Sequence, residues 1–151
     1  MTDSAGRRPG VRALGIDPGT KRIGLAISDR SGTIASPFAV LQRGRSRQHL
    51  HGEIARIVRE EEIEVVVVGL PVNMDGSHGP SAKAAIADAR RLATVVDVPI
   101  ELHDERRTSV TAERSMREAG LDGVERRRRV DKVAAAVMLQ SWLDGRARTQ
   151  R

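Results

Sequence analysis

The sequence predicts one α/β domain built on a mixed five-stranded sheet. Three short apolar runs come first, and two more then alternate with helical patterns. Runs joined by short turns pair as antiparallel strands, whereas strands separated by a helix pair in parallel. The chain has 151 residues, of which 39% are hydrophobic and 30% charged, so it is long enough for one full core. We therefore expect three antiparallel strands, then two parallel ones, flanked by helices.

The first half of the chain carries three strands and a helix. The sequence "PGTK" separates the first two apolar runs, and Ser31 with Gly32 forms a turn signal before the third. Apolar residues at positions 50, 54, 55, 58 and 63 then follow near-helical spacing. We predict strands at 11–17, 22–29 and 32–41 and a helix at 46–63.

The second half alternates between buried strands and helices. The run "EVVVVGLP" is a continuous β-branched stretch, which is typical of a strand buried on both faces. An alanine-rich segment follows, with Ser81 as its expected N-cap, and Gly145 is the expected end of the last helix. We predict strands at 64–71 and 98–105 and helices at 81–96, 109–120 and 130–145. A single domain would span residues 11–145, between flexible basic tails at 1–10 and 146–151.

The composition excludes several classes of site. The chain has no cysteine, which rules out disulfides and thiolate metal ligands. No run approaches the roughly 18 apolar residues of a membrane span, and the polar start is not that of a secretory signal. Phe38 and Trp142 are the only aromatic residues, so the aromatic platforms of many single-strand binders are missing. These features favour the cytoplasm.

The charge favours a polyanionic partner. Lysine and arginine total 26 against 20 acidic residues, and only three of the 26 are lysines. Arginine is suited to phosphate through its guanidinium fork, but a GC-rich genome would also enrich it. The charge alone does not separate these two explanations.

Acidic residues stand at the ends of three predicted elements. Asp17 ends the first strand, the pair Asp104 and Glu105 ends the fifth, and Asp131 begins the last helix. Each has a structural explanation: a turn former before Pro-Gly, a solvated strand end, and an acidic group in the first turn of a helix. Alternation places Asp104 and Glu105 on opposite faces of their strand but does not choose between them.

Convergence of these acids would indicate a metal site. Residues 134–136 are alanines, which would let the last helix lie close to the sheet, with Asp131 facing the end of the first strand. Three converging carboxylates repel one another unless a cation lies between them. Carboxylate oxygens suit Mg²⁺ or Mn²⁺, and such ions catalyse phosphodiester hydrolysis.

Four ordered motifs resemble one known family. The stretches "GIDPGTKRIGLAISD", "VVVGLPVNMDGSHGP", "DERRTSVTAE" and "VDKVAAAVMLQSWLD" are similar to the YqgF (RuvX) family over roughly residues 11–145. The resemblance implies a ribonuclease H-like fold. It also implies a nuclease of pre-16S rRNA or a Holliday junction resolvase. It places the metal-binding and catalytic acids on Asp17, Glu105 and Asp131, and so favours Glu105 over Asp104.

Nucleic-acid contacts are expected from basic residues around these acids. Lys21 and Arg22 match the family's "KRIG", and two arginine-rich stretches flank the predicted site. Asn73 and Asp75 lie in a second-motif loop that is either a substrate-side lid or an ordinary connection. The candidate nucleic-acid-binding residues are Lys21, Arg22, Arg43, Arg45, Arg47, Arg106, Arg107, Arg126, Arg127, Arg128 and Arg129.

Three functions are compatible with these residues. The first is a Mg²⁺- or Mn²⁺-dependent nuclease that processes the 5′ end of pre-16S rRNA, with a Holliday junction resolvase, which would call for a homodimer, as its alternative. The second is a non-catalytic nucleic-acid-binding factor for ribosome maturation or transcription. The third is a nucleotide-phosphate domain, because "GIDPGT" also resembles the phosphate loop of actin-like ATPases. Those enzymes close two lobes around ATP, and 151 residues supply only one.

Overall fold

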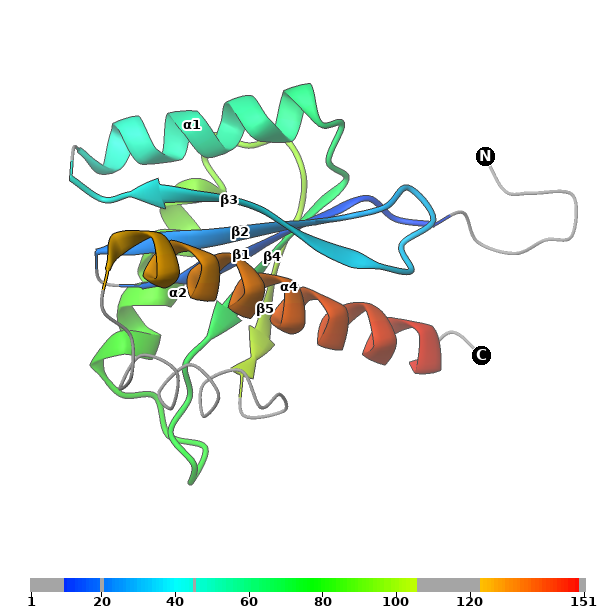
Figure 1. Cartoon of the computed structure of the whole chain (residues 1–151). Coiled ribbons are helices and arrows are strands. Elements are labelled where there is room, and N and C mark those ends of the chain that lie inside the picture. Colours follow the sequence, from blue (N-terminus) through cyan, green and yellow to red (C-terminus); the bar gives the residue numbers. More distant parts are fainter. Residues whose placement is uncertain (1–9, 20, 45, 106–122, 150–151) are drawn as a thin grey trace, which may run out of the picture.

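A computed structural model of the chain describes residues 10–19, 21–44, 46–105 and 123–149. In it a five-stranded sheet lies between two helices on one face and one long helix on the other (Figure 1). The predicted helix at 109–120 lies outside the described residues. The elements are β1 Ala13–Pro18, β2 Arg22–Ser28, β3 Ala35–Gln42, α1 Arg47–Glu60, β4 Val65–Leu70, α2 Pro80–Leu92, β5 Ile100–Asp104 and α4 Val124–Thr149.

The strand pairing confirms the predicted mixed sheet. The order is β3-β2-β1-β4-β5, with β1 in the middle. Strands β2 and β3 pair antiparallel, as do β1 and β2, whereas β4 pairs in parallel with both β1 and β5. The carboxyl ends of β1, β4 and β5 therefore meet at one edge, where open α/β sheets bind ligands.

The two faces of the sheet carry different cores. Large aliphatic residues such as Leu14, Ile16 and Leu25 pack under α1 and α2. The other face is lined mainly by smaller residues, including Ala13 and Ala26, and packs against α4. Strand residues alternate between the faces, as the period of two requires.

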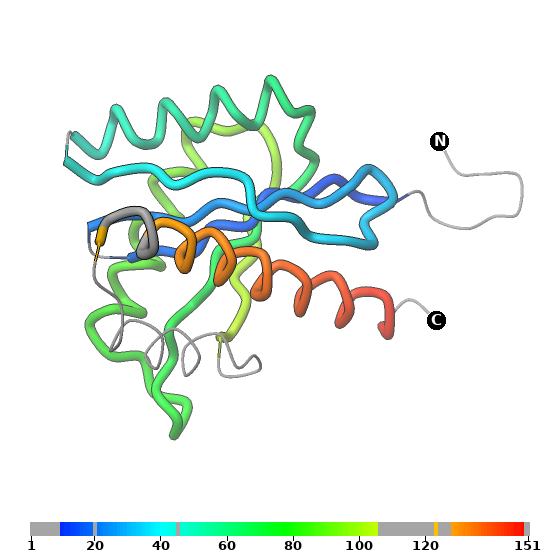
Figure 2. The backbone as a smooth tube through the Cα atoms, in the orientation of Figure 1, coloured from blue at the N-terminus to red at the C-terminus, as the bar shows by residue number. Residues whose placement is uncertain are grey.

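Helix α4 lies very close to the sheet because glycines face it. A Cβ built on Gly15 would lie 2.9 Å from the Cβ of Leu139, and one on Gly24 would lie 2.2 Å from the backbone oxygen of Asp131. Figure 2 shows the first part of α4, in orange, lying across the blue strands β1 and β2. No other residue type fits these two positions while α4 keeps its place.

The predicted limits of two helices are wrong. Helix α2 begins with Gly79 as N-cap and Pro80 in its first turn, not with Ser81 as N-cap, because proline is pre-organised for the first helical position. Helix α4 runs from Val124 through Gly145 to Thr149. The arginine run before Asp131 is helical because arginine is a strong helix former, and one glycine costs only about 1 kcal/mol. Helix α1 is capped by Ser46, whose side-chain oxygen accepts a hydrogen bond from the backbone N–H of His49.

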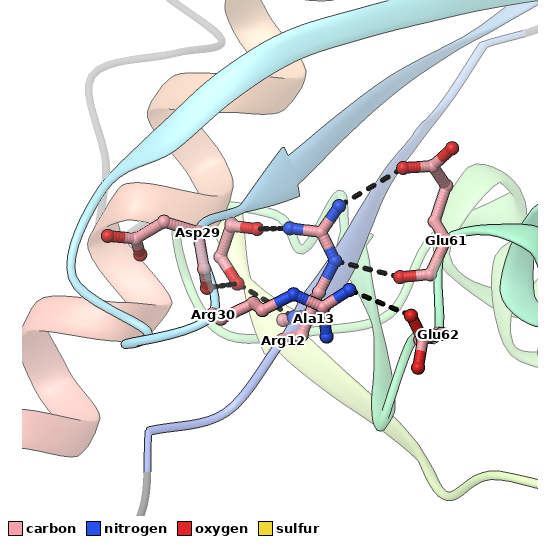
Figure 3. A network of polar contacts seen from close by, with 7 residues as sticks. Arg12, Ala13, Asp29, Arg30, Glu61 and Glu62 are labelled. Carbon is pink, nitrogen blue, oxygen red and sulfur yellow. Dashed lines mark hydrogen bonds and ion pairs between the residues drawn. The ribbon is translucent and has the colours of Figure 1, made fainter.

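The opposite end of the sheet is fixed by a polar network (Figure 3). The Arg12 guanidinium donates to the backbone oxygens of Glu61 and Ser28, both at 2.7 Å, and to a Glu61 carboxylate oxygen at 3.0 Å. Buried Ser28 accepts from the Ala13 N–H at 2.7 Å. The end of α1 is therefore tied to β1 and β2, which leaves the edge at their other end for a site.

No helix among the described residues is long and apolar enough to cross a membrane.

Candidate active site

Asp17 is buried on the face of the sheet that α4 covers. It is only 2% exposed and pairs with Gly24 across β1 and β2. Paired residues of neighbouring strands point to the same face, and Gly24 faces the backbone of Asp131. Asp17 thus lies near the end of β1, just before the turn, and its carboxylate points inward, toward α4.

Glu105 reaches the same edge from β5. It directly follows this strand and is 6% exposed. A Cβ on Gly69 would lie 2.5 Å from its Oε1 atom, so the missing side chain at Gly69 makes room for this carboxylate. Ile16 pairs with Val68, which places Asp17 and Gly69 beside each other at the next position. Two buried carboxylates therefore lie at neighbouring strand ends.

The choice between Asp104 and Glu105 has a structural basis. The Nε2 atom of His103 lies 3.1 Å from the hydroxyl of Ser141 in α4, so His103 faces α4. By alternation Glu105 shares this face and Asp104 points to the other one. Of these two residues, Glu105 is the one on the same face of the sheet as Asp17.

Asp131 comes to this face from α4. It is 8% exposed, and its Oδ2 atom accepts a 2.7 Å charge-assisted hydrogen bond from Nε of Arg22. Because α4 begins at Val124, Asp131 lies about two turns inside the helix. The interpretation of Asp131 as a first-turn residue that stabilises the helix dipole is therefore wrong.

The three acids have the donor chemistry of a hard-cation site. All three supply carboxylate oxygens, which Mg²⁺ and Mn²⁺ prefer, and Gly69 leaves space beside Glu105. Among the described residues, however, no group of three or more acidic or imidazole side chains is arranged to hold a metal ion. The residue types and the space beside Glu105 thus fit a cation, although the described side chains form no complete set of ligands.

A basic groove lies one turn from Asp131. Arg128, Arg129 and Lys132 of α4 line it together with Ala39 and Val40 of β3, and its volume is about 240 Å³. None of the three basic side chains forms an ion pair with any residue that the structure describes. Lys132 was not predicted, although its spacing of three and four residues from the two arginines puts all three on one helix face.

The predicted basic residues Arg43 and Arg47 lie in a different setting. Both bind the carboxylate of Asp88 in α2, at 3.3 and 3.1 Å, and Arg91 approaches it at 3.5 Å. Nε of Arg43 also donates to the backbone oxygen of Gly19, at 2.5 Å. These arginines join α1, α2 and the loop after β1.

The remaining predicted residues divide into exposed and undescribed ones. Lys21 is exposed, and so are Asn73 and Asp75 in the loop before α2. Arg126 and Arg127 belong to α4, but their side chains are outside the described part. Arg45, Arg106 and Arg107 also lie outside the described residues.

Curated relatives match the chain over most of its length. A protein of Anaeromyxobacter sp. (strain Fw109-5), named "Putative pre-16S rRNA nuclease", is 50% identical over 136 residues, which cover 90% of this chain and 98% of that protein. A protein of the same name from Mycobacterium ulcerans (strain Agy99) is 45% identical over 148 residues, which cover 95% and 86% of the two chains.

Solved structures identify the fold. The structure described as "T. thermophilus RuvC in complex with Holliday junction substrate" covers 93% of this chain and 98% of its own, with a TM-score of 0.59 and 17% identity. A second Thermus thermophilus RuvC structure has a TM-score of 0.57. The predicted ribonuclease H-like fold is thus confirmed. The family described as "RuvX: Holliday junction resolvase" matches residues 11–145, and this chain belongs to that family.

Proposed function

We propose that this protein is a metal-dependent nuclease that hydrolyses phosphodiester bonds in structured nucleic acid. One observation carries the proposal: three buried carboxylates, Asp17, Glu105 and Asp131, come from three separate elements to one face at one edge of the sheet. Burial of charged carboxylates is unfavourable unless they are paired or bind a cation. The burial of three carboxylates at one edge therefore favours a cation as their common partner.

Each acid would serve as a ligand of Mg²⁺ or Mn²⁺. When bound, the metal supplies a Lewis acid that activates water and stabilises the leaving oxygen. Asp17 would be the most fixed ligand, because it ends the central strand. Glu105 would lie over Gly69. Asp131 would remain next to Arg22, whose guanidinium is then close enough to approach a phosphate oxygen.

The substrate backbone would run from these acids across the basic groove of α4 and β3. Arg128, Arg129 and Lys132 are available for phosphates, and Lys21 is exposed on the loop after β1. Phosphate contacts of this kind position a strand without reading its sequence.

The substrate we favour is pre-16S rRNA, processed at its 5′ end during ribosome biogenesis. The names of two relatives at 45–50% identity support it. A four-way DNA junction is the second candidate, supported by the family description. Symmetrical cleavage of a junction would require two copies of the chain. A non-catalytic binding role is disfavoured, because acidic groups at a nucleic-acid surface weaken binding.

The test compares the wild type with Asp17→Asn on labelled pre-16S rRNA fragments and on a synthetic four-way junction. Each is incubated with Mg²⁺, Mn²⁺ or EDTA. We expect metal-dependent cleavage of the rRNA that is lost in Asp17→Asn while binding persists. Asp144→Asn is the matched control, since Asp144 is an exposed carboxylate of the same helix as Asp131.

The outcomes separate the candidates. Cleavage of the junction alone would select the resolvase. Equal binding by both proteins without cleavage under any metal would replace the nuclease with the binding factor.

A further inference from the structure

We propose that Met74 is an apolar wedge that contacts nucleobases of the substrate beside the carboxylate site. The inference rests on the proposed function and adds to it a contact with bases. Met74 is 87% exposed, the highest value among the large apolar side chains that the structure describes. An apolar side chain so fully in water, on a chain with one phenylalanine and one tryptophan, requires an explanation beyond folding.

The loop that presents Met74 is ordered by its own hydrogen bonds. The Asn73 N–H donates to the Ser77 oxygen at 3.0 Å, and the Gly76 N–H donates to the Asn73 oxygen at 2.8 Å. Asp75 accepts from both the N–H and the hydroxyl of Ser77, at 2.9 and 2.6 Å. Gly76 takes a positive φ of 91°, which closes the turn. Met74 thus lies at the tip of an ordered turn. Fixing its backbone on binding therefore costs little conformational entropy.

The loop starts at the candidate active site. It leaves the carboxyl end of β4, where Gly69 makes room for Glu105, and it projects from that edge of the sheet before α2 begins (Figures 1 and 2). Five residues from Gly69 to Met74 span at most about 18 Å when fully extended. This reach equals about five base steps of 3.4 Å, so the contact would fall within about five nucleotides of the cleaved bond.

The chemistry of Met74 favours a base over a phosphate. A thioether has no charge to neutralise a phosphate, but it is polarisable and packs well against aromatic rings. Apolar side chains such as methionine also act as wedges between base steps. The buried Trp142 lies on α4 and contacts Glu101, so it is not available for this role.

The neighbours of Met74 favour a base over a protein partner. Residues 73 and 75–78 are all exposed, and they are asparagine, aspartate, glycine, serine and histidine. A protein-binding surface needs a contiguous apolar patch, whereas a single apolar side chain with a polar rim fits between two bases.

The test uses the full chain with Asp17→Asn as background, so that substrate is bound and not cut. 2-Aminopurine is placed at each of the five positions on either side of the cleavage point, and its fluorescence reports unstacking. We expect a fluorescence increase at one or two of these positions, which Met74→Ala removes and Met74→Leu largely keeps. Affinity should fall about two- to tenfold in Met74→Ala, while the salt dependence of binding stays unchanged because no phosphate contact is lost.

One matched control and three possible results test whether Met74 contacts the bases. Ile34→Ala removes another exposed apolar side chain, at the far end of the sheet, and should leave the fluorescence unchanged. An increase that persists in Met74→Ala would overturn the wedge. So would unchanged substrate binding together with loss of self-association, which would make Met74 a contact between copies. If the Asp17→Asn background binds neither substrate, the proposed function itself fails.

Discussion

The two faces of the sheet are packed by different means. Under α1 and α2 the core consists of large aliphatic residues, with Leu14, Ile23 and Leu25 at 0–2% exposure. Under α4 the strands contribute alanine and glycine at many positions, and the same face buries three carboxylates. The face under α1 and α2 stabilises the domain by burying apolar area. The face under α4 buries less apolar area because alanines, glycines and carboxylates occupy part of it.

The difference shows where a site fits in a small domain. Large side chains hold a helix away from a sheet, and they exclude polar groups from the space between. Gly24 and Gly69 instead bring backbone or carboxylate oxygens within about van der Waals distance of the strands. The α4 face therefore holds acids at fixed positions, at the expense of buried apolar surface.

The largest expected effect comes from replacing a carboxylate of the α4 face, and it is on the rate of cleavage. Asp131→Asn should lower the cleavage rate at least about 100-fold, since even outer-shell partners of metal sites contribute about 10- to 100-fold. The rate is measured with saturating pre-16S rRNA fragment and Mg²⁺. Asp29→Asn removes an exposed carboxylate from the opposite end of the sheet and should stay within about twofold of the wild type. A rate above a tenth of the wild-type value in Asp131→Asn would remove this acid from the site.

Substitutions at the adjacent residues Gly24 and Leu25 should separate effects on stability from effects on activity. Leu25→Ala, on the face under α1, should lower the free energy of unfolding by about 2–5 kcal/mol through the cavity that it leaves, without changing cleavage per folded molecule. Gly24→Ala should cost about 1–3 kcal/mol by pushing α4 outward, and it should also slow cleavage because Asp131 moves. Urea unfolding and cleavage assays measure both. Equal cleavage in the two variants would argue against close packing as the means of placing Asp131.

The two basic regions should differ in the salt dependence of binding. Replacing Arg128, Arg129 and Lys132 with glutamine should reduce the slope of log affinity against log salt by about 2–3, since each phosphate contact contributes about 0.7–0.9. Replacing Arg43 and Arg47 should reduce the slope by less than about 1, because both are paired with Asp88. Electrophoretic mobility shifts over a range of salt concentrations give the slopes. The reverse order would place the substrate path on the other basic region.

The smallest expected effect is on the pH dependence of stability. Burial lowers the pKa of His51 from its ordinary value of 6.5, and Arg47, Arg43 and Arg91 lower it further against the opposing charge of Asp88. With a folded pKa below the unfolded one, the unfolded state binds the proton more readily, so stability rises with pH. The stabilisation is complete above about pH 6.5 and is lost as the pH falls from there through the folded pKa.

The variant His51→Gln checks this sign. Urea unfolding between about pH 5 and pH 8 should show a shallower pH slope in His51→Gln than in the wild type. His49→Gln, at an exposed position of the same helix, serves as the control. A steeper slope in His51→Gln would mean that the protonated form is the one stabilised in the folded state.

Much of the fold was predictable because it follows local patterns. The hairpin around "PGTK" and the β-branched run of β4 gave strands close to their observed limits. The ends of α2 and α4 were missed, because Pro80 and the arginine run extend helices whose apolar pattern starts later. The metal-ligand roles of Asp17, Glu105 and Asp131 remain predictions, although all three are buried at one edge.

The sequence by itself determined the succession of strands and helices, the excess of arginine and the presence of acids at element ends. These properties depend on residue type and on spacing along the chain. Only the tertiary structure decided which charges are available. It joined Arg43 and Arg47 to Asp88 and left Arg128, Arg129 and Lys132 unpaired among the described residues. The physical reason is that the pairing of a charge depends on which residues distant in sequence the fold brings within a few ångströms of it.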